Sequence, residues 1–186
     1  MKENFKLGGI LLIIAATAGL LLGAAHSITL KPIAKQEQMS KAAAMKEILP
    51  EASEFKVKEV TLSGTIKEVN EGLTSGKTSG YVITVTPKGY GGTIQLMVGI
   101  STKGNVEGIK ILSHSETPGL GANAPQPKFS GQFKGKSIDK KLEVVKKAPS
   151  NSNEIEAITG ATITSRAVTN GVNEAITFYN TNLKGD

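Results

Sequence analysis

The N-terminal part of the chain is a long apolar run. Residues 7–30 contain no Asp, Glu, Lys or Arg, and aliphatic side chains cluster at 10–14 and 20–22. A helix of about 20 residues, rising roughly 1.5 Å per residue, crosses the hydrocarbon core of a bilayer. The pattern therefore predicts a transmembrane helix over 7–30, preceded by a short N-terminus, 1–6.

A cleaved signal peptide is the alternative for this run. Lys2 and Lys6 precede it, and the small residues Gly23 and Ala25 resemble a cleavage site. The length of the run favours a retained anchor. Lysines flank the span on both sides, so the positive-inside rule gives no decision. The short N-terminus favours a cytoplasmic start, and we expect a single-pass protein of the cell membrane whose globular part lies outside the cytoplasm.

The pattern changes after the span. Residues 31–50 form a helical linker, because apolar positions from 35 to 49 follow a helical period and Pro50 ends it. Short apolar segments bounded by Gly, Pro or Asn follow. They predict strands at 56–62, 65–69, 81–86, 93–98 and 106–112.

Two further segments complete the expected domain, 51–186. Residues 118–135 hold three prolines and four glycines, which predicts an ordered but irregular loop. Residues 166–179 place apolar side chains on one helical face, which predicts a helix packed on the sheet. The fold class is therefore α+β: one N-terminal transmembrane helix and one domain with a largely antiparallel sheet and packed helices.

Composition removes several classes of function. The 186 residues include no Cys, which excludes thiolate-bound iron–sulfur clusters, c-type haem, disulfides and Cys nucleophiles in this chain. His26 and His114 lie in unrelated contexts, so no metal site is expected. The net charge of +6 comes from lysines spread along the chain without interleaved aromatics, and no nucleic-acid partner is expected.

The chemically distinctive segment is 158–165, Ile-Thr-Gly-Ala-Thr-Ile-Thr-Ser, directly before the last predicted helix. Its hydroxyl groups can cap the first turn of that helix, with Thr164 or Ser165 as the natural N-cap. Alternatively, the small residues before Thr162 expose its hydroxyl beside a helix N-terminus, where N–H groups and the helix dipole attract a phosphate. Arg166 is the one arginine of the chain, and at this end of a helix its charge is unfavourable unless an anion offsets it.

Three sequence blocks resemble one family of flavoproteins. Segment 158–165 resembles the S/T-G-A-T motif at which a flavin transferase esterifies the phosphate of FMN to a threonine, and the matching acceptor is Thr162. Segment 114–121, His-Ser-Glu-Thr-Pro-Gly-Leu-Gly, is similar to the E-T-P-G-L-G hallmark of the G subunit of Rnf-type ion-pumping electron-transport complexes and of the related C subunit of the Na⁺-pumping NADH:quinone oxidoreductase. Segment 89–92, followed by a strand and Val98-Gly99-Ile100, fits the same family.

The resemblance implies a covalent FMN, held by a threonine phosphoester, in an electron carrier without catalytic residues of its own. The implied cofactor-binding residues lie in the two blocks: Thr159, Gly160, Ala161, Thr162, Thr164, Ser165, Arg166, Glu116, Thr117, Gly119, Leu120 and Gly121. The loop 116–121 is expected to approach the isoalloxazine.

The resemblance also implies partners. They are the other Rnf membrane and iron–sulfur subunits, a flavin transferase for maturation and the lipid bilayer, in a complex that moves electrons between ferredoxin and NAD⁺ and couples this to Na⁺ or H⁺ transport. Two alternatives stay open, a flavoprotein like the C subunit of the quinone reductase and a non-redox anchored binding or sensory module.

The chain departs from the family pattern at two places. The family has an Asp where this chain has Glu156, which bears on recognition by the transferase. Between the two blocks the family carries a Trp, whereas this chain has Phe129 and Phe133 in that region and no Trp. Any stacking on the flavin must therefore use other groups.

Overall fold

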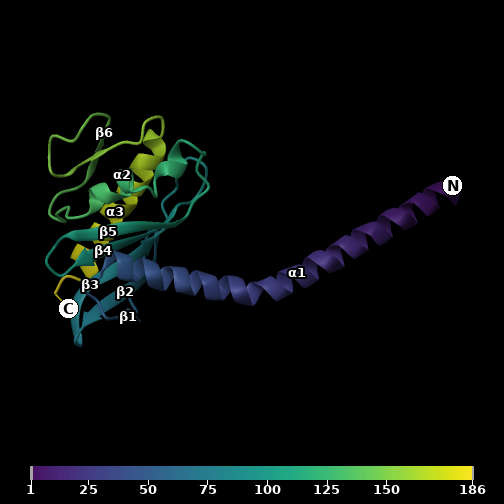
Figure 1. Cartoon of the computed structure of the whole chain (residues 1–186), viewed down its shortest axis with the longest axis horizontal. Helices are drawn as coiled ribbons and strands as arrows, with labels where there is room; N and C mark the ends of the chain where they lie inside the picture. The colour runs from purple at the N-terminus through teal and green to yellow at the C-terminus, as the bar shows by residue number, and fades with distance from the viewer. Residues whose placement is uncertain (1, 186) are drawn as a thin grey trace. The chain divides into compact units, whose positions relative to one another are not determined.

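The structure is a computed structural model that describes residues 2–185. Its contacts divide the chain into two compact units, one up to residue 41 and one from residue 42 onward. The helix α1, Lys2–Ile48, covers the predicted span and most of the predicted linker, and it ends before Pro50 (Figure 1). Pro32 lies inside it, where the missing N–H removes one helical hydrogen bond.

Among the described residues, α1 is the one helix long and apolar enough to cross a membrane. Its aliphatic side chains lie open in the first unit: Leu12 is 72% exposed, Leu20 76% and Ile28 75%. These side chains have no protein core to enter, so this part of α1 has an apolar surface suited to lipid.

The second unit is built on a five-stranded antiparallel sheet, which confirms the predicted fold class. Its strands are β1 (Glu54–Val57), β2 (Ile66–Thr74), β3 (Lys77–Val85), β4 (Gln95–Ser101) and β5 (Val106–Ser113). Each strand pairs with the next in sequence, so the sheet order is β1-β2-β3-β4-β5 (Figure 1). The strand predicted at 56–62 is largely wrong: pairing ends at Val57, and Val60 packs on the core from an irregular segment.

The two faces of the sheet are covered by different helices. Tyr81, Ile83 and Val85 point with Leu96 and Val98 into a core shared with α3 (Thr162–Asn182). The alternate residues Val82 and Met97 point to the other face. There they pack against Ala44, Ile48 and Leu49 at the end of α1. The period-2 alternation of each strand places apolar side chains on both faces because both are covered.

The region predicted as an irregular loop, 118–135, contains three short helical segments: η1 (Gly121–Asn123), α2 (Pro127–Ser130) and η2 (Gly131–Phe133). Phe129 and Phe133 are buried and meet edge to face, with ring centroids 5.6 Å apart. The segment is anchored by these two rings.

The fold also contains a second, two-stranded parallel sheet that the sequence pattern does not predict. Strand β6 (Glu143–Val145) pairs with β7 (Glu154–Glu156) at the end of the domain that carries the label β6 in Figure 1. Each strand has three residues, too few for a clear hydrophobic period. Strand β7 leads directly into the segment 158–165, so this small sheet fixes the start of the motif.

The loop between β6 and β7 makes the carboxyl group of Glu154 unusually acidic. Glu154 accepts hydrogen bonds from the Ser150 N–H (2.7 Å) and the Asn151 side-chain amide (2.6 Å). These bonds lower the pKa of Glu154 from 4.5 to about 2, the Ser150 N–H contributing most. Because the folded-state pKa is lowered, the ionised carboxylate stabilises the folded loop at pH values above its unfolded-state pKa of 4.5. This stabilisation is lost as the pH falls through about 2. NMR titration of the Glu154 carboxyl carbon should give this value, and Asn151→Ala should raise it. An unperturbed titration would contradict the loop geometry.

Candidate functional site

The N-terminus of α3 lacks the cap that the sequence predicts. The helix begins at Thr162, its N-cap residue is Ala161, and no side chain of residues 2–185 caps the first turn. The predicted caps, Thr164 and Ser165, lie inside the helix instead. The prediction is wrong because both hydroxyl groups are engaged by other partners. The backbone N–H groups at the start of α3 are therefore without a side-chain cap.

The four hydroxyl side chains of the motif have different environments. Ser165 is fully buried, donates to the Ala161 carbonyl (2.9 Å) and accepts from the Ile158 N–H (2.9 Å). Thr164 is buried and donates to the Glu116 carboxylate. Thr159 is exposed. Thr162 is half-buried at the first position of α3, and no hydrogen bond of its hydroxyl occurs within residues 2–185.

Thr162 lines an open cavity of about 470 Å³, which we call the Thr162 cavity. The predicted loop and the predicted motif meet here, although they lie far apart in sequence. The lining residues are Tyr90, Glu116, Thr117, Leu120, Gly121, Gly160, Ala161, Thr162, Ile163 and Thr164. All of them except Tyr90 and Ile163 are predicted site residues.

Glu116 joins three segments around this cavity. The residue is 5% exposed. One carboxylate oxygen accepts from the Gly91 N–H (2.9 Å), in the turn between β3 and β4, and the other accepts from the Thr164 hydroxyl, on α3. The side chain thus ties the loop 116–121 to that turn and to the start of the helix.

Two glycines make this arrangement sterically possible. A Cβ at Gly121 would lie 2.5 Å from the Thr164 hydroxyl and 2.7 Å from a Glu116 carboxylate oxygen. Gly160 has a φ of +75°, and a Cβ there would lie 2.9 Å from Leu120. Any other residue at Gly121 would separate the loop from α3, and any other residue at Gly160 would be strained.

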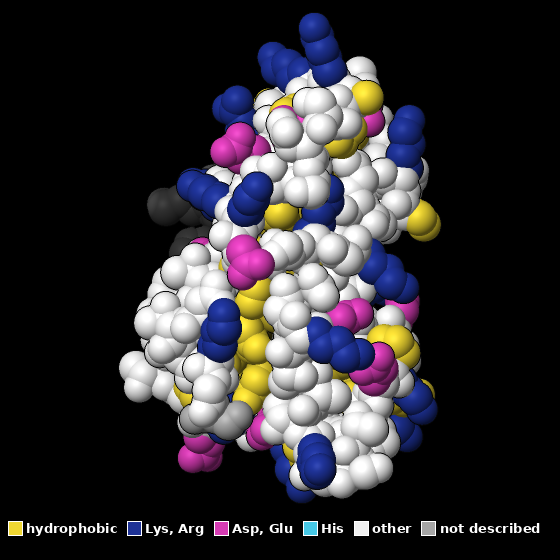
Figure 2. Space-filling model, turned by 90° about the vertical axis from the view of Figure 1, so that its left-hand side faces the viewer, with side chains coloured by type: hydrophobic (Ala, Val, Ile, Leu, Met, Phe, Trp, Pro, Cys, Tyr) yellow, Lys and Arg dark blue, Asp and Glu magenta, His cyan; other side chains and the backbone are white. Residues whose placement is uncertain are grey.

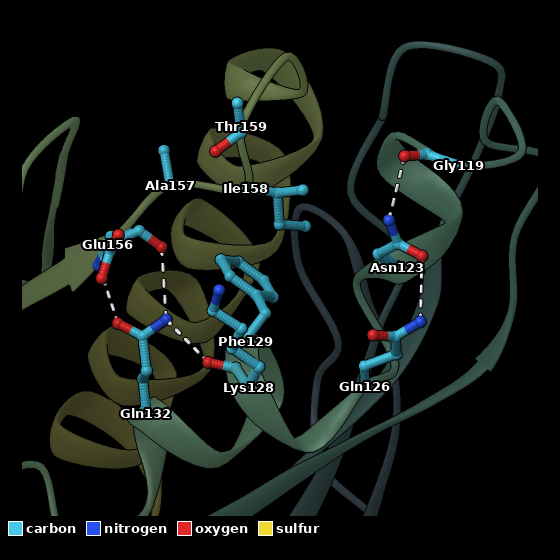
Figure 3. A pocket seen from close by; sticks show the side chains of 10 residues that line it. All are labelled: Gly119, Asn123, Gln126, Lys128, Phe129, Gln132, Glu156, Ala157, Ile158 and Thr159. Atoms are coloured by element: carbon cyan, nitrogen blue, oxygen red, sulfur yellow. Dashed lines mark hydrogen bonds between the residues drawn. The ribbon is translucent and has the colours of Figure 1, made fainter.

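A second hollow, the Phe129 hollow, lies on the other side of the contact between Leu120 and Gly160. Its volume is about 310 Å³. Figure 3 shows its lining: Gly119, Asn123, Gln126, Lys128, Phe129, Gln132, Glu156, Ala157, Ile158 and Thr159. The Gln132 side chain accepts from the Glu156 N–H (2.7 Å) and donates to the Glu156 carbonyl (3.2 Å), which fixes β7 beside η2.

The remaining predicted site residues do not line the Thr162 cavity. Thr159 and Gly119 belong to the Phe129 hollow. Ser165 is buried behind the start of α3, and Arg166 is exposed one helical turn after Thr162 without lining either space. The motif runs from the Phe129 hollow, which Thr159 lines, to the Thr162 cavity, which begins at Gly160. The motif is therefore divided between the two spaces.

Two cavity residues are missing from the set that the sequence predicts. Tyr90 is 70% exposed and Ile163 57% exposed, and with Leu120 (41%) they form an apolar rim around Thr162. Tyr90 lies within segment 89–92, and the family resemblance of that segment could have indicated Tyr90 as a site residue. Ile163 lies inside the motif itself. Exposed large apolar side chains gathered at one cavity indicate a binding surface.

Comparisons with known proteins identify the family to which the chain is similar. Residues 89–177 match the family model described as "FMN-binding domain". The chain is 40% identical over 96% of its length to the G subunit of the Na⁺-translocating ferredoxin:NAD⁺ oxidoreductase complex of Acetobacterium woodii, of which 92% is covered. It is 42% identical over 86% of its length to the G subunit of the proton-translocating ferredoxin:NAD⁺ oxidoreductase complex of Clostridium ljungdahlii, of which 82% is covered.

Solved structures show the same fold at lower sequence similarity. The C subunit of the Na⁺-translocating NADH-quinone reductase from Parabacteroides distasonis superposes with a TM-score of 0.62 at 21% identity, over 81% of this chain and 94% of that one. The NqrC protein of Shewanella oneidensis gives 0.52 at 22% identity, over 69% and 67%. These two structures support the fold alone.

Proposed function

The chain belongs to the G-subunit family of ion-translocating oxidoreductase complexes, and from this premise we propose that it is a membrane-anchored electron-carrier subunit with FMN covalently joined to Thr162. In this proposal the anchor is 7–30, the helical linker 31–50 and the FMN-binding domain 51–186. The complex transfers electrons between ferredoxin and NAD⁺ and couples this to Na⁺ or H⁺ transport, as the names of the relatives describe for them. Similarity to the G subunits over nearly the whole chain favours this over a quinone-reductase subunit.

One observation carries the choice of attachment residue. Thr164 and Ser165 have hydroxyl groups that are buried and hydrogen-bonded, and Thr159 faces the other hollow. Thr162 combines an unengaged hydroxyl, within the described residues, with a position in the Thr162 cavity. An ester forms most readily at a hydroxyl that an enzyme can reach and that no fold contact holds.

The cavity fits FMN at both ends. The uncapped N–H groups at the start of α3 and the helix dipole favour a phosphate at Thr162. The rim formed by Tyr90, Leu120 and Ile163 offers apolar surface to a flat ring. The volume of about 470 Å³ lies within the range of roughly 300–1,000 Å³ for small-molecule sites.

In this proposal the residues of the chain serve to position the flavin. FMN, when bound, supplies the ability to accept and give one or two electrons. Thr162 tethers the phosphate, and the start of α3 provides N–H donors for it. Glu116 keeps the loop and the helix together, so that Leu120 and Tyr90 stay against the ring. Phe129 and Phe133 are buried, which leaves ring contacts to the rim.

Attachment requires a phosphoanhydride donor such as a flavin dinucleotide. Thr162 would supply the ester oxygen: its hydroxyl would replace the nucleoside monophosphate on the flavin-side phosphorus, so that the phosphoanhydride bond breaks as the phosphoester forms. The hydroxyl proton passes to a base of the flavin transferase, because neither Glu116 oxygen is free for it within the described part of the chain.

The proposal places the globular domain outside the cytoplasm. With the N-terminus in the cytoplasm, α1 delivers the domain to the outer side of the cell membrane. Protease added to intact spheroplasts should then cleave the domain.

The function is tested by in-gel fluorescence. Full-length protein co-expressed with a flavin transferase should give a fluorescent band under ultraviolet light after denaturing electrophoresis, because only a covalent flavin survives denaturation. Peptide mass spectrometry should place FMN on the peptide that contains Thr162. A band without fluorescence, from protein that is folded in detergent, would favour the non-redox anchored module.

Glu156 offers a graded test of transferase recognition. Its side chain is exposed on the Phe129 hollow, ahead of the acceptor, and its carboxylate is engaged by no described residue. A charge-assisted hydrogen bond contributes about 1.5–3 kcal/mol, so losing one would slow flavin attachment by about tenfold or more. We expect Glu156→Asp to keep the wild-type rate of attachment and Glu156→Ala to be slow. Equal rates for all three proteins would make the carboxylate an ordinary surface charge.

A further inference from the structure

Positive charge is concentrated in the segment 128–147, which we call the basic segment. It contains seven lysines and two acidic residues, Asp139 and Glu143. The net charge of the whole chain is +6, so most of it resides in this short stretch. The segment includes β6 and lies at the end of the domain that is uppermost in Figure 2, where dark blue side chains gather.

The lysines of the basic segment pair with no carboxylate in residues 2–185, unlike three lysines elsewhere in the domain, and they differ from other such lysines, for example Lys67 and Lys77, by lying close together in the sequence. Lys56, Lys103 and Lys110 form ion pairs with glutamates at 3.5, 3.4 and 2.7 Å. Lys136 donates to the carbonyls of Ser152 (2.6 Å) and Glu154 (3.0 Å). The other six are exposed and pair with no carboxylate in residues 2–185: Lys128, Lys134, Lys140, Lys141, Lys146 and Lys147. Uncompensated like charges repel one another, so this surface favours an anionic partner.

The sheet register places part of this charge beside the Phe129 hollow. Val145 pairs with Glu156, and the Ala157 N–H donates to the Val145 carbonyl (2.8 Å). Lys146 is the next residue, so the Lys146-Lys147 pair begins at the edge of the hollow that Ala157 lines. Lys128 lines the same hollow (Figure 3). Lys128 therefore lines the hollow directly, together with Phe129, Ile158 and the carboxylate-bearing Glu156, and Lys146 and Lys147 follow in the chain after the strand that pairs with β7.

We propose that the Phe129 hollow and its bordering lysines Lys128, Lys146 and Lys147 form a docking surface for a partner protein that presents carboxylates, within the assembled complex. The hollow accepts an anchoring side chain, and the lysines select an acidic surface around it. Interfaces combine a desolvated anchor with charged rim contacts in this way. The inference rests on the proposed membership of a multi-subunit complex, and because Glu156 also lines the hollow, flavin attachment is measured separately in every variant.

Two other anionic partners fit less well. Nucleic acid binding uses exposed aromatic rings or base contacts, whereas Phe129 and Phe133 are 3% and 0% exposed. Surface binding to a bilayer combines basic side chains with large apolar ones that insert. Within the described residues of 128–147, no large hydrophobic side chain is exposed. A folded, carboxylate-bearing protein surface matches both the charge and the hollow.

The test uses a charge reversal and a matched control in the full-length chain. Lys146→Glu/Lys147→Glu changes the docking surface, and Lys67→Glu/Lys77→Glu makes the same change of charge on exposed positions of β2 and β3. Each tagged protein is co-expressed with the other subunits and a flavin transferase, and retention of the subunits is measured in mild detergent over a series of KCl concentrations. We expect the first variant to weaken retention by about tenfold and the control to leave it unchanged.

A zero-length carbodiimide, which joins amines to carboxylates, identifies the contact in the wild-type complex. Cross-links from Lys146 or Lys147 to a carboxylate of another subunit support the proposal. Equal retention by both variants, or cross-links confined to this chain, overturns it. Protection of these lysines from acetylation by phosphatidylglycerol vesicles, with retention unchanged, would also overturn it and assign the surface to lipid. In-gel flavin fluorescence of the same samples reports separately on the attachment of FMN.

Discussion

Thr162→Ala should abolish covalent flavin while the domain stays folded. The substitution removes the one motif hydroxyl that is both unengaged among the described residues and open to the Thr162 cavity. Ala is the best helix former, and Thr162 stands at the first position of α3 without a capping bond. The free energy of unfolding should therefore change by less than about 1 kcal/mol.

Denaturing gels and peptide masses measure this result. Wild-type protein should fluoresce and Thr162→Ala should be dark, with the same thermal unfolding in detergent. Thr159→Ala is the matched control, because it removes a hydroxyl that faces the Phe129 hollow. It should retain full fluorescence. Covalent flavin in the Thr162→Ala protein, carried on Thr159 or Thr164, would show that the attachment site has been misassigned.

Glu116→Ala should destabilise the domain and reduce flavin attachment together. The change leaves two groups without their partner: the buried Thr164 hydroxyl and the Gly91 N–H, which lies in an exposed turn. A buried unsatisfied group costs about 1–3 kcal/mol, and the Thr164 hydroxyl is the buried one, so the free energy of unfolding should fall by about 1–3 kcal/mol. Since the same bonds hold the loop 116–121 against α3, the rim around Thr162 should loosen as well.

Glu116→Gln separates a positioning role from a general loss of stability. The amide oxygen can still accept from Gly91, and the Thr164 hydroxyl can turn to accept from the amide nitrogen. We expect the glutamine variant to recover most of the stability and the flavin content, measured by thermal unfolding and in-gel fluorescence. Thr164→Val, which keeps the shape and removes the bond, should resemble a mild form of Glu116→Ala. Wild-type flavin loading in a destabilised Glu116→Ala protein would show that Glu116 contributes stability alone.

The alternation of apolar residues predicts most of the main sheet. Strands β3, β4 and β5 are long and rich in Val and Ile, and both faces of the sheet are covered, so their pattern is strong. The prediction fails where apolar residues pack without pairing, as at Val60. It also misses β6 and β7, because three residues do not define a period and their parallel pairing depends on distant parts of the chain.

The predicted cap at Thr164 or Ser165 fails for a related reason. Local sequence shows that a hydroxyl could bond the nearest free N–H, but it does not show competing partners. Glu116 takes the Thr164 hydroxyl from 48 residues away, and the Ile158 N–H and Ala161 carbonyl take the Ser165 hydroxyl. Tertiary contacts thus leave the first turn of α3 open, which favours phosphate binding over capping.

The sequence by itself determined the long apolar helix, the α+β class, the family and the two blocks that line the Thr162 cavity, because these depend on hydrophobic period and on motif identity along the chain. The tertiary structure alone decided which hydroxyl is open, that Glu116 turns inward as a clamp, that Tyr90 and Ile163 complete the rim, and that the motif divides between two cavities. Each of these depends on which distant groups compete for the same hydrogen bond or the same space. That competition exists only when the chain is folded.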